Sequence, residues 1–276
     1  MPYDPTIYEG SAAYYAAGRP AYSRELVSTL TREVGLDGSG RLLDVGCGPG
    51  ILTVELAASF EEAVGLDPDA DMLAEGVRRA DQAGITNINW VRATAEDIPS
   101  LSLGDFRLAT FGQSLWWTDR DQVLATVHSL LAPGGAVALI NHAFEGRPQP
   151  PGPGYPPIPH DEIKALIDQY LGPQRRAGRG LRPPPGEPYA QTLTRAGFDR
   201  YRVVFAPGRA DIVQDVDGVL ANFFSMSFAA PHLFADRRED FEADVRDLLL
   251  TRSPSGRFWD WPGDTEIVLA NRPSDG

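Results

Sequence analysis

The sequence predicts an α/β fold, in which helices cover both faces of a doubly wound, mostly parallel sheet. Between residues 41 and 141, strand-like and helix-like segments alternate with short connections, a pattern typical of parallel strands joined by right-handed crossovers. A glycine-rich turn within Leu42–Gly50 joins the first of these strands to the first helix. Ligands of such sheets bind beyond the carboxyl ends of the strands, so we expect a functional site in the loops there.

The individual elements follow from short apolar runs and from apolar residues at helical spacing. In the second helix, for example, Met72, Leu73, Val77 and Ala80 share one face. The expected strands are 41–45, 63–66, 88–91, 106–111 and 136–140, and the expected helices are 51–60, 69–83 and 119–131.

The alternation breaks after residue 141. Seven prolines lie within Gly146–Pro159, and the segments 142–189 and 207–264 are rich in Phe, Trp, Pro and Arg. We expect these two insertions to form a helical cap over the strand ends, while 190–206 and 265–276 return to the sheet region. The expected elements are helices at 160–171, 212–224 and 236–250, a helix–strand remnant at 189–197 and 201–206, and a strand at 265–270.

Composition excludes several classes of function. The chain has 276 residues and a net charge of −13, from 25 basic and 38 acidic side chains, so it would repel a nucleic-acid backbone. Cys47 is the single cysteine beside four histidines, which excludes an internal disulfide and makes a metal site improbable. No apolar run approaches the roughly 18 residues of a membrane span, and the start lacks a signal-peptide pattern. We therefore expect a cytoplasmic protein with no metal and no membrane or nucleic-acid partner.

The glycine turn carries the sharpest chemical information. Its spacing is G-x-G-x-G, preceded by Asp44 at the strand end, and Asp67 ends the next strand about 20 residues further on. Glycines let a ligand approach the backbone closely. An acidic residue at the end of the second strand is typical of a contact to ribose hydroxyls. Asp44 would repel a pyrophosphate but attract a cation. A ligand with a cationic side, a ribose and no phosphates fits S-adenosylmethionine, although a glycine turn alone is also compatible with a dinucleotide.

Four motifs in order give the chain a resemblance to a known family. Residues 41–141 resemble the core of the class I S-adenosylmethionine-dependent methyltransferases. The matching segments are Leu42–Gly50, Gly65–Pro68, the adenine-edge loop Ala95–Pro99 and the turn Leu130–Gly135. The resemblance implies a Rossmann-like sheet of seven strands, six parallel and one reversed, and a lid of helices within residues 1–40.

The resemblance also implies a set of cofactor contacts. Asp67 would bind the ribose, Glu96 or Asp97 the adenine amino group, Ile98 the ring and Arg19 the carboxylate. Structural roles remain open for several of them: Asp67 as a helix cap, Met72 as core and Thr94 with Asp97 as a capping box. The expected cofactor-binding residues are Asp44, Gly46, Gly48, Asp67, Pro68, Met72, Ala95, Glu96, Asp97, Ile98, Gln113, Arg19 and Tyr15.

The acceptor side is predicted from position alone. The expected substrate-pocket residues are Trp116, Trp117, Tyr14 and Phe224. The candidate general base is His142, which follows the fifth strand. His160 and His232 lie in the insertions and are further candidates for the pocket.

Macromolecular acceptors fit the sequence poorly. After the fourth strand the chain reads Phe-Gly-Gln-Ser-Leu-Trp-Trp over 111–117, unlike amino-methylating DNA enzymes, and no Pro-Cys nucleophile is present. We predict methyl transfer to O, N or C of a small apolar or aromatic metabolite, as in natural product biosynthesis. The alternatives are cyclisation or decarboxylation assisted by the same cofactor, a catalytically silent cofactor-binding partner and, more distantly, a dinucleotide-dependent reductase. The oligomeric state and the acceptor remain open.

Overall fold

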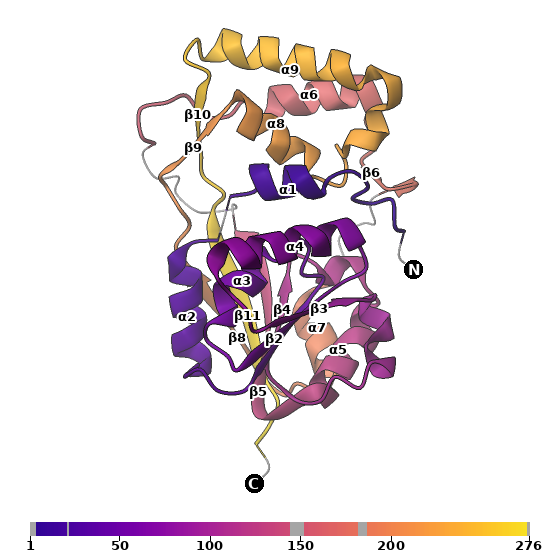
Figure 1. Cartoon of the computed structure of the whole chain (residues 1–276), viewed down its shortest axis with the longest axis vertical. Coiled ribbons are helices and arrows are strands. Elements are labelled where there is room, and N and C mark those ends of the chain that lie inside the picture. The colour runs from indigo at the N-terminus through magenta and orange to yellow at the C-terminus, as the bar shows by residue number, and fades with distance from the viewer. Residues whose placement is uncertain (1–3, 21, 144–151, 182–186, 275–276) are drawn as a thin grey trace.

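A seven-stranded sheet forms the centre of the computed structural model, which describes residues 4–20, 22–143, 152–181 and 187–274. The strand order is β3-β2-β1-β4-β5-β11-β8, and β11 runs antiparallel to both of its neighbours. This confirms the predicted Rossmann-like sheet with one reversed strand (Figure 1). The strands are β1 (Arg41–Val45), β2 (Glu62–Asp67), β3 (Ile88–Arg92), β4 (Phe106–Gly112), β5 (Leu131–Ala143), β8 (Tyr201–Ala206) and β11 (Asp264–Asn271).

Helices cover both faces of the sheet because successive strand residues point to opposite sides. In β1, Leu42 packs into one apolar cluster with α2 and α3, whereas Leu43 and Val45 pack into the other with α5 and α7. The same alternation in β5 places Ile140 on the α2 side. The flanking helices are α2 (Arg24–Val34), α3 (Ile51–Ala57), α4 (Ala70–Ala83), α5 (Arg120–Leu130) and α7 (Tyr189–Arg195).

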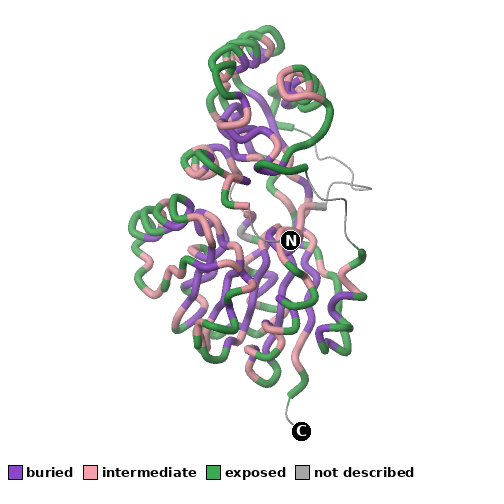
Figure 2. The backbone as a smooth tube through the Cα atoms, turned by 90° about the vertical axis from the view of Figure 1, so that its right-hand side faces the viewer, coloured by how far each residue is buried: buried purple, intermediate pink, exposed green. Residues whose placement is uncertain are grey.

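A second body, the cap, sits over the carboxyl ends of the strands and has its own apolar core (Figures 1 and 2). Aromatic side chains dominate that core: the rings of Phe234 and Phe241 stack with centroids 4.2 Å apart. The cap contains α1 (Ala12–Gly18), α6 (His160–Leu171), α8 (Val216–Phe224), η3 (Pro231–Arg237) and α9 (Arg238–Arg252), with the paired strands β9 (Ile212–Asp215) and β10 (Arg257–Asp260) and the small hairpin β6 (Arg176–Ala177) to β7 (Gly180–Leu181).

The segment expected as an N-terminal lid is divided between the two bodies. Helix α1 packs on α8 of the cap, where the Ser11 hydroxyl donates a hydrogen bond to the Phe224 carbonyl at 3.0 Å. The backbones approach so closely that a Cβ on Gly18 would lie 2.1 Å from the Asn222 nitrogen. Helix α2 instead packs against the sheet through Leu26 and Leu30.

The prediction of a helix over 212–224 is wrong for its first four residues. Residues 212–215 form β9, which pairs antiparallel with β10, a strand that the sequence pattern did not reveal. Helix α8 begins only after Asp215, whose side chain accepts a hydrogen bond from the Gly218 amide at 2.8 Å and caps the helix. The helix expected at 236–250 likewise runs over 238–252, and the one expected at 51–60 ends at 57. Within the described residues, no helix has the length and apolar character needed to cross a bilayer.

Candidate functional site

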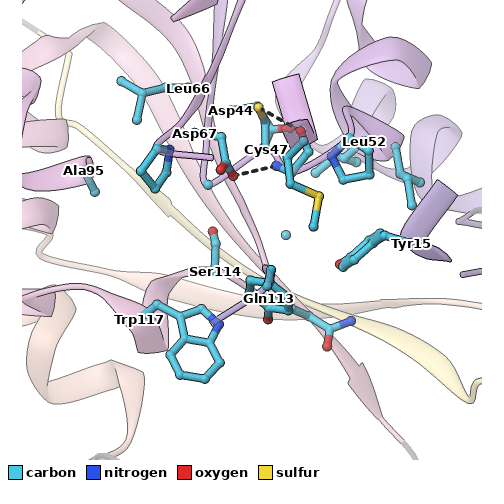
Figure 3. Close-up of a pocket in the computed structure, with 18 of the residues that line it drawn as sticks. Tyr15, Asp44, Cys47, Leu52, Leu66, Asp67, Ala95, Gln113, Ser114 and Trp117 are labelled. Carbon is cyan, nitrogen blue, oxygen red and sulfur yellow. Dashed lines mark hydrogen bonds between the residues drawn. The ribbon is translucent and has the colours of Figure 1, made fainter. Parts of the chain in front are cut away.

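A cleft lies at the carboxyl ends of β1, β2, β4 and β5, beneath the N-terminal segment (Figure 3). Its empty volume is about 1170 Å³ with its open mouth included. Asp67 and Ala95 lie on one side of the cleft and Tyr15 on another (Figure 3). The lining residues among the predicted cofactor contacts are Tyr15, Arg19, Asp44, Gly46, Gly48, Asp67, Pro68, Met72, Ala95, Glu96 and Gln113.

The glycine turn after β1 forms the floor of the cleft. Gly46 has φ +65°, and a Cβ there would lie 2.5 Å from the Cβ of Ser114. The amides of Gly46 and Cys47 donate to the Leu66 carbonyl at 2.8 and 3.0 Å, and the Ser114 hydroxyl donates to the Val45 carbonyl at 2.5 Å. The turn is thereby fixed to both neighbouring strands. Burial raises the pKa of the Cys47 thiol well above its usual value, so it is a neutral filler at physiological pH.

Asp67 holds the turn from the side of β2. One carboxylate oxygen accepts from the Gly48 amide at 2.8 Å and the other from the Asp69 amide at 2.9 Å. Burial raises the pKa of Asp67 to about 6. Asp69, not Asp67, caps α4, since its side chain accepts from the amides of Asp71 and Met72. The carboxylate of Asp67 lines the cleft, where its remaining lone pairs can accept hydrogen bonds from a ligand.

Asp44 lies behind the turn and is 1% exposed. Its two oxygens accept from the hydroxyls of Thr53 at 2.6 Å and Thr110 at 2.7 Å, which ties β1 to α3 and β4. Desolvation by burial raises the pKa of Asp44 to about 6. A cation bound in the cleft would favour the ionised form.

Of the cofactor contacts predicted in the loop after β3, some line the cleft and others do not. Ala95 and Glu96 line the cleft, and Glu96 also accepts from the Asp119 amide at 2.8 Å. Asp97 and Ile98 do not line it. Asp97 forms the capping box with Thr94, accepting from its amide at 3.0 Å and its hydroxyl at 2.7 Å, and Ile98 is buried in the core of the sheet region.

The loop after β4 contributes Gln113 and Trp117. Gln113 has φ +58°, a strained conformation for a side chain of this kind, and its amide donates to the Ile140 carbonyl at 3.0 Å. The ring of Trp117 meets Tyr8 edge-on, with centroids 6.2 Å apart. Trp116 is half-buried outside the cleft lining, so the structure brings one of the two tryptophans to the site.

The N-terminal segment closes the cleft from above. Arg19 stacks its guanidinium 5.1 Å from the Tyr15 ring centre and donates from Nε to the Ser225 hydroxyl at 2.9 Å. A residue of the cap thus positions Arg19 at the rim. Tyr8 and Tyr22 also line the cleft. Tyr22 was not predicted there; its only sequence signal is its place just after the Arg-Pro pair.

Tyr14 and Phe224, expected in the substrate pocket, lie elsewhere. Their rings contact each other at 5.1 Å inside the cap core, and neither lines the cleft. The prediction failed because α1 packs against α8, so their aromatic side chains form the cap's own core.

A second cavity, here called the chamber, adjoins the cleft between the sheet and the cap. Arg19, Pro20, Tyr22 and His142 line both cavities. The ring of His142 stacks on Tyr22 with centroids 6.1 Å apart. Burial is the main cause that lowers the pKa of His142 to about 4, so this imidazole is neutral at physiological pH.

The chamber contains residues that the sequence did not place at the site. Except for Ser23, which lies in the N-terminal segment, their only sequence signal was their position in the two insertions. The pairing of β9 with β10, which brings Asp260 there, joins segments over 40 residues apart. His160 was the one side chain among them named as a possibility. The others include Ser23, Arg209, Asn222, Met226, Asp260 and Trp261.

Comparison with known proteins relates part of this chain to known methyltransferases. A family model described as a methyltransferase domain matches residues 42–135. The chain is 26% identical over 130 residues to the probable S-adenosylmethionine-dependent methyltransferase CRG1 of Saccharomyces cerevisiae, covering 46% of this chain and 44% of that protein. It is 28% identical over 145 residues to methyltransferase cfoB of Aspergillus candidus, covering 50% and 44%. The chain therefore spans less than half the length of these relatives.

A solved structure supports the fold over nearly the whole chain. The S-adenosylmethionine-dependent methyltransferase from Thiobacillus denitrificans, in complex with S-adenosyl-L-homocysteine, superposes with a TM-score of 0.52 at 14% identity and covers 97% of this chain and 98% of that one. The domain match lies over the four motifs and the strands that hold them at the cleft. Residues 42–135 therefore match a methyltransferase domain, and nearly the whole chain shares the fold of a solved S-adenosylmethionine-dependent methyltransferase.

Proposed function

We propose that the chain binds S-adenosylmethionine in the cleft and transfers its methyl group to O, N or C of a small, largely apolar metabolite. One observation carries this proposal: a single cavity is lined by the glycine turn, by Asp67 and by the loop at Ala95, and it adjoins a chamber under the cap. The cleft would bind the cofactor, and the chamber would bind the acceptor.

The cofactor contacts are assigned by their chemistry. Asp67 accepts the ribose hydroxyls while its bonds to Gly48 and Asp69 hold the carboxylate in place. Ala95 and Glu96 face the adenine. Arg19, fixed by Ser225, pairs with the carboxylate of the cofactor, and the buried charge of Asp44 favours its cationic side.

Bound S-adenosylmethionine supplies an electrophilic methyl group on a sulfonium. The chain supplies position and a dry environment. Tyr8, Tyr15 and Trp117 cover the cleft, and they exclude water from the path between cofactor and acceptor. Gln113, held in its strained conformation by the Ile140 carbonyl, fixes the wall at the end of β4.

Calorimetric titration tests this function. S-adenosylmethionine and S-adenosylhomocysteine should bind with micromolar affinity, and NADH should not bind. Formation of S-adenosylhomocysteine in the presence of an acceptor then separates methyl transfer from cyclisation, decarboxylation or a silent binding role. Binding of NADH without either sulfur ligand would contradict the proposal.

A further inference from the structure

The chamber contains two buried polar atoms that lack a hydrogen-bond partner within the described part of the chain. They are Oγ of Ser23 and Oδ1 of Asn222. The two residues are 4% and 5% exposed, and both line the chamber. An unpaired buried polar atom destabilises a fold, and such atoms in a cavity are the pattern expected where a bound molecule supplies the missing partner.

A histidine–carboxylate pair lines the same chamber. Nε2 of His160, at the start of α6, lies 3.4 Å from Oδ1 of Asp260 in β10. Asp260 is 9% exposed, whereas about half of the His160 side chain is exposed. When Nε2 donates its hydrogen to the carboxylate, the neutral ring keeps Nδ1 as a proton acceptor. This is the arrangement in which a carboxylate orients a general base.

The rest of the lining indicates the class of acceptor. Tyr22, Met226 and Trp261 provide apolar and aromatic surface suited to a flat ring. Arg19 and Arg209 line the chamber as well. Arg209 also pairs with Asp211 and Arg19 is assigned to the cofactor carboxylate, so it is the remaining N–H groups of the two side chains that favour a developing oxyanion over an ammonium ion. The basicity of an imidazole is closer to that of a phenolate or an enolate than to that of an aliphatic alkoxide, so this base suits a phenol or an enol better than an aliphatic alcohol.

We propose that the chamber binds a phenol or enol acceptor and that His160, positioned by Asp260, accepts the proton of its hydroxyl. This proposal rests on the proposed function. The acceptor oxygen forms the new bond to the methyl carbon, and the carbon–sulfur bond breaks with its electron pair moving to sulfur. The sulfonium becomes the neutral thioether of S-adenosylhomocysteine, and the proton passes to His160 and then to solvent along its exposed side. Asn222 and Ser23 hydrogen-bond the polar substituents of the acceptor.

Equilibrium binding is the first test. The protein saturated with S-adenosylhomocysteine is titrated with 7-hydroxycoumarin, whose fluorescence reports ionisation of its hydroxyl, and with benzylamine as a cationic comparison. The coumarin should bind and benzylamine should not. His160→Gln should weaken coumarin binding or abolish the ionisation change, whereas the matched variant His232→Gln should behave as wild type, because His232 lies outside both cavities with its ring against the Glu9 carbonyl.

Asn222→Leu tests the unpaired amide independently. If Asn222 serves a ligand, this variant should lose at least tenfold in coumarin affinity while its melting temperature stays equal to that of wild type or rises. A fall of several degrees with unchanged coumarin affinity would overturn the role of Asn222 as a ligand contact.

Turnover at several pH values identifies the base. With 7-hydroxycoumarin as acceptor, His160→Gln should lower kcat by about a hundredfold or more, and the loss should shrink at high pH, where the phenol ionises without help. Asp260→Asn should shift the pH profile of kcat, since Asp260 acts through His160. The other groups that line the chamber and can carry charge are Arg19, Arg209 and His142, and His142 is neutral. The more acidic 4-nitrophenol should be less affected by both changes.

The outcomes separate the two proposals. If wild type fails to bind S-adenosylhomocysteine, the proposed function fails. If it binds S-adenosylhomocysteine but neither binds nor methylates the two phenols, or binds benzylamine instead, the acceptor class is overturned. If His142→Gln, rather than His160→Gln, removes the pH-dependent rate, the base is the histidine that the sequence alone favoured.

Discussion

Asp67 connects the sequence, the fold and the proposed chemistry at the scale of a single residue. Its position at the end of β2 could be predicted from the motif, but its two hydrogen bonds to the backbone of the glycine turn and of Asp69 could not. The side chain thus builds the turn that surrounds the cleft and lines the cleft itself.

Asp67→Ala should therefore weaken the binding of S-adenosylhomocysteine by about a hundredfold, because charge-assisted hydrogen bonds contribute about 1.5–3 kcal/mol each. Calorimetry measures the change. Asp71→Ala is the control, since Asp71 is exposed on α4 and lies outside the cleft lining. Equal losses of affinity in both variants would show that Asp67 acts only through the net charge of the protein and not through a direct contact with the ligand.

The two buried carboxylates also predict a pH dependence. The pKa values of Asp44 and Asp67 are raised by burial to about 6, from 3.8. In the ligand-free protein this stabilises the protonated folded form, and that contribution to stability is lost as pH rises from about 4 through 6. A ligand that binds the ionised carboxylates reverses this preference.

Affinity for S-adenosylhomocysteine should consequently fall as pH is lowered through about 6, and binding near that pH should release protons. The ligand-induced rise in melting temperature should be larger at pH 7.5 than at pH 5. Calorimetry in two buffers of different ionisation enthalpy measures the proton release. Constant affinity over this range would show that neither carboxylate must be ionised for binding.

At the scale of elements, Trp90 of β3 explains three glycines around the cleft. A Cβ on Gly50, Gly65 or Gly76 would lie 2.4 to 2.8 Å from the indole ring. These glycines leave room for the ring that supports the turn and α4. This contact could not be predicted from the sequence, because the three glycines and the tryptophan meet only once β2 and β3 pair and α4 folds over them.

Gly76→Ala should destabilise the protein by about 1–3 kcal/mol through overpacking, although alanine is the better helix former. Denaturant unfolding measures the loss. In a Trp90→Leu background the same change should cost little, since the ring has gone. An equal loss of stability in both backgrounds would show that the strain does not come from contact with the Trp90 ring.

The elements that could be predicted are those whose signal is local. Helix α4 and the core strands carry apolar periodicity within a few residues, and the resemblance supplied the reversed strand at 265–270. Strands β9 and β10 escaped because each is four residues long and is stabilised by its partner over 40 residues away. The placement of Tyr14 and Phe224 failed for the same reason: both belong to a core created by the packing of α1 on α8.

At the scale of the whole molecule, the cap and the sheet region have separate apolar cores. The two regions meet at the cleft and the chamber. The bond from Arg19 to Ser225 crosses this junction next to the cleft. It positions a residue of the cofactor site from the cap, so cofactor binding and cap position should be linked.

Ser225→Ala should therefore weaken binding of S-adenosylhomocysteine about threefold to tenfold, and hydrogen exchange in α1 and α8 should quicken. Ser129→Ala is a suitable control, since its hydroxyl donates only to the Thr126 carbonyl within α5. Faster exchange with unchanged affinity would indicate that Arg19 does not contact the cofactor.

The most direct test of the account is a crystal structure of the protein with S-adenosylhomocysteine. The adenosine should lie between Asp67 and the Ala95–Glu96 loop, with the ribose hydroxyls on the Asp67 carboxylate and the sulfur directed toward His142 and the chamber. Density for the ligand in the chamber, or with the adenine at the Arg19 end, would contradict the assignment of the cleft.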